Sequence, residues 1–200
     1  MTQNQVQQEI SIIKEMIDKT RKETAESGHL FIFMGIASAF FVLIISLLEM
    51  YRVDHLVIPA MIILTCLNGL VGYFVVSKPV KEEKVQSYPK TVVLSLWVVC
   101  GVTLLMITFL FPFLKVYTFR ALGTLASLIL GIAVFMTGVI YEMRFVVWYS
   151  LAWWVGAVLM AISDSPYRFL IMIAVIFIAW IVPGFIMNKK YKNRSEKNEA

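Results

Sequence analysis

Long stretches of this chain lack any ionisable side chain. Six segments of 18 to 21 residues contain no Asp, Glu, Lys, Arg or His, although the 200 residues include 13 acidic and 18 basic ones. Proton relays and ion pathways inside a membrane usually use ionisable groups that face the bundle interior. Their absence argues against a proton-coupled transporter with a membrane-centre carboxylate.

Motifs for hydrolytic, metal and redox chemistry are also missing. The sequence has no HExxH, no GxSxG and no pair of aspartates within an apolar segment, which argues against intramembrane proteases. His29 and His55 lie at segment boundaries on opposite sides, and Cys66 and Cys100 form no CxxC. We therefore expect no catalytic residue, no metal site and no cofactor, and no enzymatic activity.

The apolar composition places the chain in a membrane. Apolar residues make up 60% of the sequence, and the mean hydropathy is +0.79. About 20 residues at a rise of 1.5 Å cross a hydrocarbon core of roughly 30 Å, and only helices satisfy every backbone group within such a segment. We predict an all-α, integral membrane bundle of six helices over 30–187, with spans 30–48, 56–76, 92–111, 121–140, 145–162 and 169–187.

The distribution of Lys and Arg predicts the orientation. The N-terminal segment, the second and fourth connections and the C-terminal tail hold 14 of these residues, and the other three connections hold 4. Basic residues near helix ends stay cytoplasmic, so both termini should be cytoplasmic. The basic tail 188–200 should contact anionic lipid headgroups of the bilayer, and the charge needs no nucleic-acid partner.

Residues 1–29 are expected to form a cytoplasmic amphipathic helix. Its apolar seam consists of Val6, Ile10, Ile13 and Ile17, at alternating steps of four and three. The seam can pack on the protein's own loops, on a protein partner or second copy, or on lipid. Residues 1–28 carry four basic and five acidic groups, and this balance favours a protein surface over lipid. Gly28 offers a left-handed cap or a hinge before the first span.

Polar and bulky residues within the spans are candidates for lining a ligand site. Asn68 lies inside the second span, and Trp153 and Trp154 lie in the middle of the fifth. An amide at that depth more often bonds to a neighbouring helix, and tryptophan more often simply packs. At least one of the two indole N–H groups should find a partner.

Small residues indicate where helices approach closely. Gly123, Ser127 and Gly131 recur at steps of four in the fourth span, and Ala152 and Gly156 lie in the fifth. Such faces allow close backbone contact in lipid, so spans four and five should form a tight hairpin. Pro183-Gly184 should bend the last span near its cytoplasmic end.

A short sequence similarity relates the two halves of the chain. GIASAFFVLIISLLEMYR at 35–52 and GIAVFMTGVIYEMR at 131–144 both run from Gly-Ile-Ala to Glu-Met and then Arg. Three-plus-three halves of opposite topology are common in transporters. An inverted repeat is therefore one interpretation, and a chance match of apolar sequence is the other.

The stretch IKEMIDKTRKETAESGHLFIFMGI, followed by several spans and IVPGF before a lysine-rich tail, resembles uncharacterised small multipass inner-membrane proteins of bacteria. The resemblance implies a bacterial inner-membrane location and no named activity.

Two functions remain as hypotheses. The first is a non-catalytic accessory or regulatory membrane protein that acts through helix-mediated protein contacts. The second is a small transporter or channel for an apolar or zwitterionic solute. An enzyme acting on lipid at the cytoplasmic interface would need His29, Glu142 and loop carboxylates to converge, which the sequence does not indicate.

Overall fold

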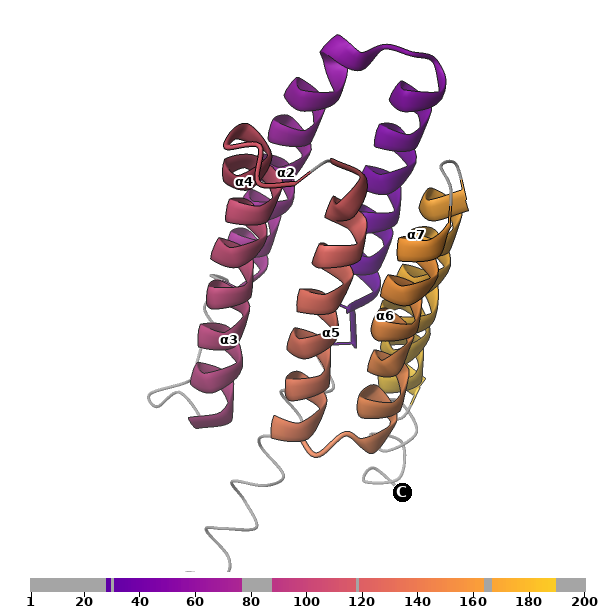
Figure 1. The fold of residues 1–200 in the computed structure, drawn as a ribbon. Coiled ribbons are helices and arrows are strands. Elements are labelled where there is room, and N and C mark those ends of the chain that lie inside the picture. Colours follow the sequence, from indigo (N-terminus) through magenta and orange to yellow (C-terminus); the bar gives the residue numbers. More distant parts are fainter. Residues whose placement is uncertain (1–27, 30, 77–87, 118, 164–166, 190–200) are drawn as a thin grey trace, which may run out of the picture.

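The described part of the chain is all-helical. A computed structural model describes residues 28–29, 31–76, 88–117, 119–163 and 167–189, and it contains no strand in these ranges (Figure 1). The seam residues Val6, Ile10, Ile13 and Ile17 and the tail from residue 190 lie outside them. Five helices are long and apolar enough to cross a membrane: Phe31–Met50, Thr91–Phe113, Leu122–Ile140, Arg144–Ile162 and Tyr167–Lys189.

The sixth apolar segment of the sequence is helical as well. It forms α2 (Asp54–Val76), in which the shorter apolar stretch His55–Leu67 is described in full. The remaining elements are listed in chain order: α3 (Tyr88–Leu105), the π-helix η1 (Met106–Leu110), α4 (Phe111–Phe113), the 3-10 turn η2 (Phe119–Ala121), α5 (Leu122–Ile140), α6 (Arg144–Ile162), α7 (Tyr167–Ile176) and the π-helix η3 (Phe177–Ile181), which continues as helix over 182–189.

The closest helix pair is the antiparallel hairpin of α5 and α6, which lie side by side along their length (Figure 1). A methyl group on Gly131 would lie 3.0 Å from Cβ of Trp153, and one on Gly138 would lie 3.0 Å from the Val147 nitrogen. The Ser127 hydroxyl donates a 2.7 Å hydrogen bond to the Trp153 carbonyl. Small residues therefore let the two backbones approach at three levels of the hairpin.

The helix of 31–50 packs on the last helix through glycines. A methyl group on Gly184 would lie 2.9 Å from the Gly28 carbonyl oxygen and 3.0 Å from the Ile32 nitrogen, and one on Gly35 would lie 3.2 Å from Cβ of Trp180. The expectation of a left-handed Gly28 is wrong, because this residue is helical and no described glycine has positive φ. Gly28 is needed for close approach rather than for a special backbone angle.

Three helix ends use the same turn without glycine. Arg52, Lys115 and Glu142 have φ of 57°, 56° and 54°. In each turn the next residue's N–H donates to the carbonyl five positions back: Val53 to Leu48, Val116 to Phe111 and Met143 to Gly138. This pattern is the Schellman motif, which satisfies carbonyls at a helix end. Glu142 thus lies in the α5–α6 turn, followed by Arg144 at the start of α6.

The glycine crossing gives the first prediction. Gly184→Ala should lower the free energy of unfolding by about 1–3 kcal/mol, because backbone atoms of the neighbouring helix must move to make room. Gly101→Ala is the matched control, since a methyl group there meets nothing within 4 Å and alanine favours helix by about 1 kcal/mol. Thermal unfolding in detergent measures both. Equal midpoints for the two variants would show that the crossing is not tight.

Candidate functional site

Three tryptophans from three elements meet at the centre of the packed helices. Trp153 of α6 is 0% exposed, and its ring lies 5.4 Å from that of Trp180 in η3, at an interplanar angle of 75°. Trp97 of α3 lies 6.2 Å from Trp180 on the other side. The edge-to-face contact of Trp153 with Trp180 adds about 0.5–1.5 kcal/mol to the burial of the rings. We call these three residues the tryptophan centre.

The indole N–H groups of Trp97 and Trp153 differ in their hydrogen bonding. Nε1 of Trp97 donates to Oγ1 of Thr137 at 3.2 Å, and this hydroxyl donates to the Ala133 carbonyl at 2.7 Å. Nε1 of Trp153 is buried and has no hydrogen-bond partner among the described residues. A buried donor without a partner costs about 1–3 kcal/mol, so Trp153 is held in place by its packing.

The candidate residues named from the sequence lie in different surroundings. Trp154 is half-buried, with its ring 5.7 Å from that of Phe135. Asn68 is a residue of α2, and its side chain lies outside the described part. The structure therefore brings Trp153 to the centre and leaves Trp154 at the side of the α5–α6 hairpin.

The small residues named from the sequence all lie on α5 and α6. A methyl group on Gly123 would lie 3.5 Å from Sδ of Met160, Gly156 faces Val175 of α7, and Ala152 packs against the buried core. Trp97 and Trp180 were not singled out by the sequence reasoning. Their mid-span positions, like that of Trp153, are a signal that could have found them.

Each π-helix ends two residues before a proline. In the first, the Phe111 N–H donates to the Met106 carbonyl, five residues back, and Pro112 follows. In the second, the Val182 N–H donates to the Phe177 carbonyl, and Pro183 follows. Proline has no N–H, and its ring clashes with the carbonyl four residues back. A widened turn removes this clash, and π-helices of this kind often occur at functional sites.

Tyr117 supplies the donor that Pro112 cannot. In the π-helical register, the Ile107 carbonyl faces residue 112, which lacks an N–H. The Tyr117 hydroxyl donates to this carbonyl instead. Burial raises the pKa of Tyr117 above its ordinary value, so the hydroxyl keeps its proton at neutral pH. The hydrogen bond folds residues 114–117 back over the end of the helix.

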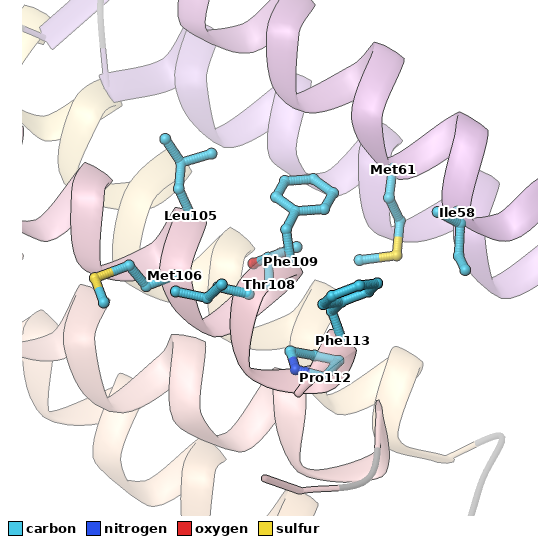
Figure 2. Close-up of a pocket in the computed structure, with 9 residues that line it drawn as sticks. Ile58, Met61, Leu105, Met106, Thr108, Phe109, Pro112 and Phe113 are labelled. Atoms are coloured by element: carbon cyan, nitrogen blue, oxygen red, sulfur yellow. The ribbon is translucent and has the colours of Figure 1, made fainter. Parts of the chain in front are cut away.

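An apolar groove lies between α2 and the segment of η1 and α4. Figure 2 shows the rings of Phe109 and Phe113 on one side and Met61 and Ile58 on the other. Its volume is about 690 Å³, and Thr108 supplies the one hydroxyl among its lining residues, which are Ile58, Met61, Leu105, Met106, Thr108, Phe109, Leu110, Pro112 and Phe113. The groove is suited to an apolar ligand. We refer to it below as the apolar groove.

Charged residues with described side chains lie at helix ends. Nε of Arg168 donates to the Ser163 carbonyl at 2.6 Å, and Nη1 donates to the Arg120 carbonyl at 3.4 Å, which ties two loops together. Within the described ranges, no three His, Cys, Asp or Glu side chains gather in a way that could hold a metal ion. Cys66 and Cys100 are both free thiols there, the first exposed and the second buried.

Comparisons with protein families, with curated proteins and with solved structures found no match. The proposals below therefore depend on the residues and contacts of this chain.

Thr137 provides the second prediction. Thr137→Val keeps the shape of the side chain but removes the acceptor of the Trp97 indole, so the free energy of unfolding should fall by about 1–3 kcal/mol. Thr103→Val is the control, because its hydroxyl only bonds back to the Val99 carbonyl on an exposed helix. Thermal unfolding and tryptophan fluorescence measure both variants. A Thr137→Val protein as stable as Thr103→Val would contradict this role of the hydrogen bond.

Proposed function

We propose that the chain is an inner-membrane protein of bacteria with six spanning helices and both termini in the cytoplasm. Five apolar helices and α2 supply the six. The two ends of the described chain meet, since Nδ2 of Asn188 lies 3.4 Å from Nδ1 of His29, as an even number of crossings requires. Large apolar side chains such as Trp148, Leu170 and Ile63 are exposed, which suits contact with lipid.

We propose that its role is accessory or regulatory, without catalysis. The observation that carries this proposal is the tryptophan centre. The space between α3, α5, α6 and η3 is filled by Trp97, Trp153, Trp180 and aliphatic side chains, with hydroxyl groups bonded to backbone carbonyls nearby. A rigid apolar interior supports a scaffold that holds surfaces in position, and among the described residues no Asp, Glu, His, Lys or Arg is buried there to act as an acid or base.

The surface that would meet a partner is the N-terminal seam of Val6, Ile10, Ile13 and Ile17. A cytoplasmic helix with a narrow apolar face is suited to a groove or to a short coiled coil. Gly28, which fixes the start of the first helix against Gly184, would set the place from which this helix leaves the bundle.

The third prediction tests the seam. Replacing Ile10, Ile13 and Ile17 together with Ser should abolish cross-links to a partner or to a second copy, because the seam loses its apolar side chains. The matched control replaces Lys14, Asp18 and Arg21 with Ser, which changes three charged residues of the same segment and leaves the seam intact. Cross-linking in membranes followed by mass spectrometry measures both, and alkaline extraction checks insertion. Cross-links that persist unchanged in the Ile variant would overturn the accessory role.

A small transporter for an apolar or zwitterionic solute is the second candidate. The turns that join the first and second helices of each half agree in detail: Tyr51 and Tyr141 donate to the carbonyl four residues back, and Arg52 and Glu142 have φ of 57° and 54°. The third helix of each half carries a π-helix, one residue and a proline. These shared features favour a three-plus-three inverted repeat. The Lys115 turn has the same hydrogen bonds, so the turn alone is not specific to the repeat.

The fourth prediction separates the two candidates. Ala179→Cys, in a chain with Cys66→Ser and Cys100→Ala, should stay unmodified by a water-soluble thiosulfonate, because Ala179 is 0% exposed beside the tryptophan centre. Ala161→Cys is the control, since this residue is exposed near the end of α6. Labelling in sealed vesicles and mass spectrometry measure the reaction. A reactive Cys at 179 would show that water reaches the centre and would favour the transporter.

A further inference from the structure

We propose that the apolar groove binds one acyl chain of an anionic phospholipid, with the headgroup at Lys115. This inference depends on the membrane location proposed above, but not on the choice between an accessory protein and a transporter. Four observations carry it: the chemistry of the lining, the length of the groove, the position of Met61 on α2 and the charge at the end of the groove.

The lining selects an apolar ligand. Eight of the nine lining side chains are apolar, and the ninth, Thr108, has a single hydroxyl. A polar solute would leave its own groups without partners in such a site. The volume of about 690 Å³ is within the range of roughly 300–1,000 Å³ that is typical of small-molecule sites. An acyl chain meets both conditions.

The length of the groove corresponds to one leaflet. Its lining extends along the helix from Leu105 to Phe113, and eight residues at 1.5 Å give about 12 Å. Half of a hydrocarbon core of roughly 30 Å is about 15 Å. Pro112 and Phe113 line one end of the groove, next to the turn of 114–117, and this end of the helix is where a phospholipid headgroup would sit.

Met61 lines the groove from α2. Met61 is buried, with 3% of its surface exposed, whereas its neighbours Ile62 and Ile63 are exposed. In lipid, no hydrophobic force drives two apolar helices together, so a gap between α2 and η1 is filled by whatever apolar group fits it best. The flexible side chain of Met61 can adapt to such a chain.

The charge at this end favours an anionic headgroup. Lys115 follows Phe113 by two residues and is exposed, and its positive φ directs the chain away from the helix. Arg120 and Arg168 lie close together, where Nη1 of Arg168 donates to the Arg120 carbonyl, and Arg52 lies with the acidic Glu49 at the turn before α2. Lysine binds a phosphate as a point charge. Tyr117, through its bond to the Ile107 carbonyl, fixes the turn that carries Lys115.

A photo-crosslinking experiment tests the proposal. The protein is reconstituted in phosphatidylcholine vesicles that contain phosphatidylglycerol with a diazirine in one acyl chain, and the sites of reaction are mapped by mass spectrometry. We expect cross-links to concentrate on residues 105–113 and to exceed those on the exposed face of α6 at Val155 and Val158. Met61→Trp should lower them to the α6 level by filling the groove. Ile62→Trp, its exposed neighbour, should leave them unchanged.

A second set of variants tests whether the lipid headgroup binds at Lys115. Lys115→Gln should reduce cross-links from labelled phosphatidylglycerol and leave those from equally labelled phosphatidylcholine unchanged, whereas Lys189→Gln, at the opposite end, should alter neither. Ile58→Trp replaces Met61→Trp if the latter does not elute as a folded protein. Uniform labelling over η1 and α6 in an alkali-resistant membrane protein would overturn the groove proposal alone. A chain that alkali extracts from membranes would overturn the membrane location instead.

Discussion

The close approach of α5 and α6 is the constraint on which the rest of the packing depends. Lipid offers no hydrophobic force between helices, so the pair is held by contacts that only small residues permit. Gly131 leaves room for Trp153, Gly138 leaves room for Val147, and Ser127 bonds across the interface. This places the Trp153 ring at the centre, where Trp180 packs against it. A larger residue at 131 would push α6 away, and the tryptophan centre could not form.

The second constraint is the missing N–H of proline in an apolar environment. Each unsatisfied backbone group there costs several kcal/mol, so a proline changes the helix around it. At Pro112 the result is a π-helix, a turn that ends in Tyr117 and a hydroxyl that replaces the missing donor. The same residues line the apolar groove. At Pro183 the π-helix places Trp180 toward the centre instead. The missing proline N–H thus accompanies a surface groove near Pro112 and a core contact of Trp180 near Pro183.

The positions of the helices could be predicted from the sequence, because length and hydropathy determine them. The observed helices begin and end within about two residues of the predicted segments, except that α3 begins at Tyr88, four residues before the predicted start at 92. The close pairing of spans four and five was also readable, from glycine and serine at steps of four. The π-helices were not, because periodicity does not show how a helix responds to proline. The Trp97–Thr137 bond joins residues 40 positions apart, and the groove joins residues of α2 to residues more than 40 positions further along the chain, so both depend on tertiary packing.

The residues that form the buried core are different from the residues that line the apolar groove. The α5–α6 hairpin, α7, η3 and α3 contain most of the buried side chains, including Trp153, Val134 and Ile176, and α2 contributes Met61 among its described side chains. Changes at sites without shared neighbours have nearly additive effects. None of the residues that line the groove belongs to the core cluster around Trp153 and Trp180. A lipid chain in the groove would therefore act on α2 and η1, where Ile58, Met61 and Phe109 line it, and leave the contacts of the hairpin in place.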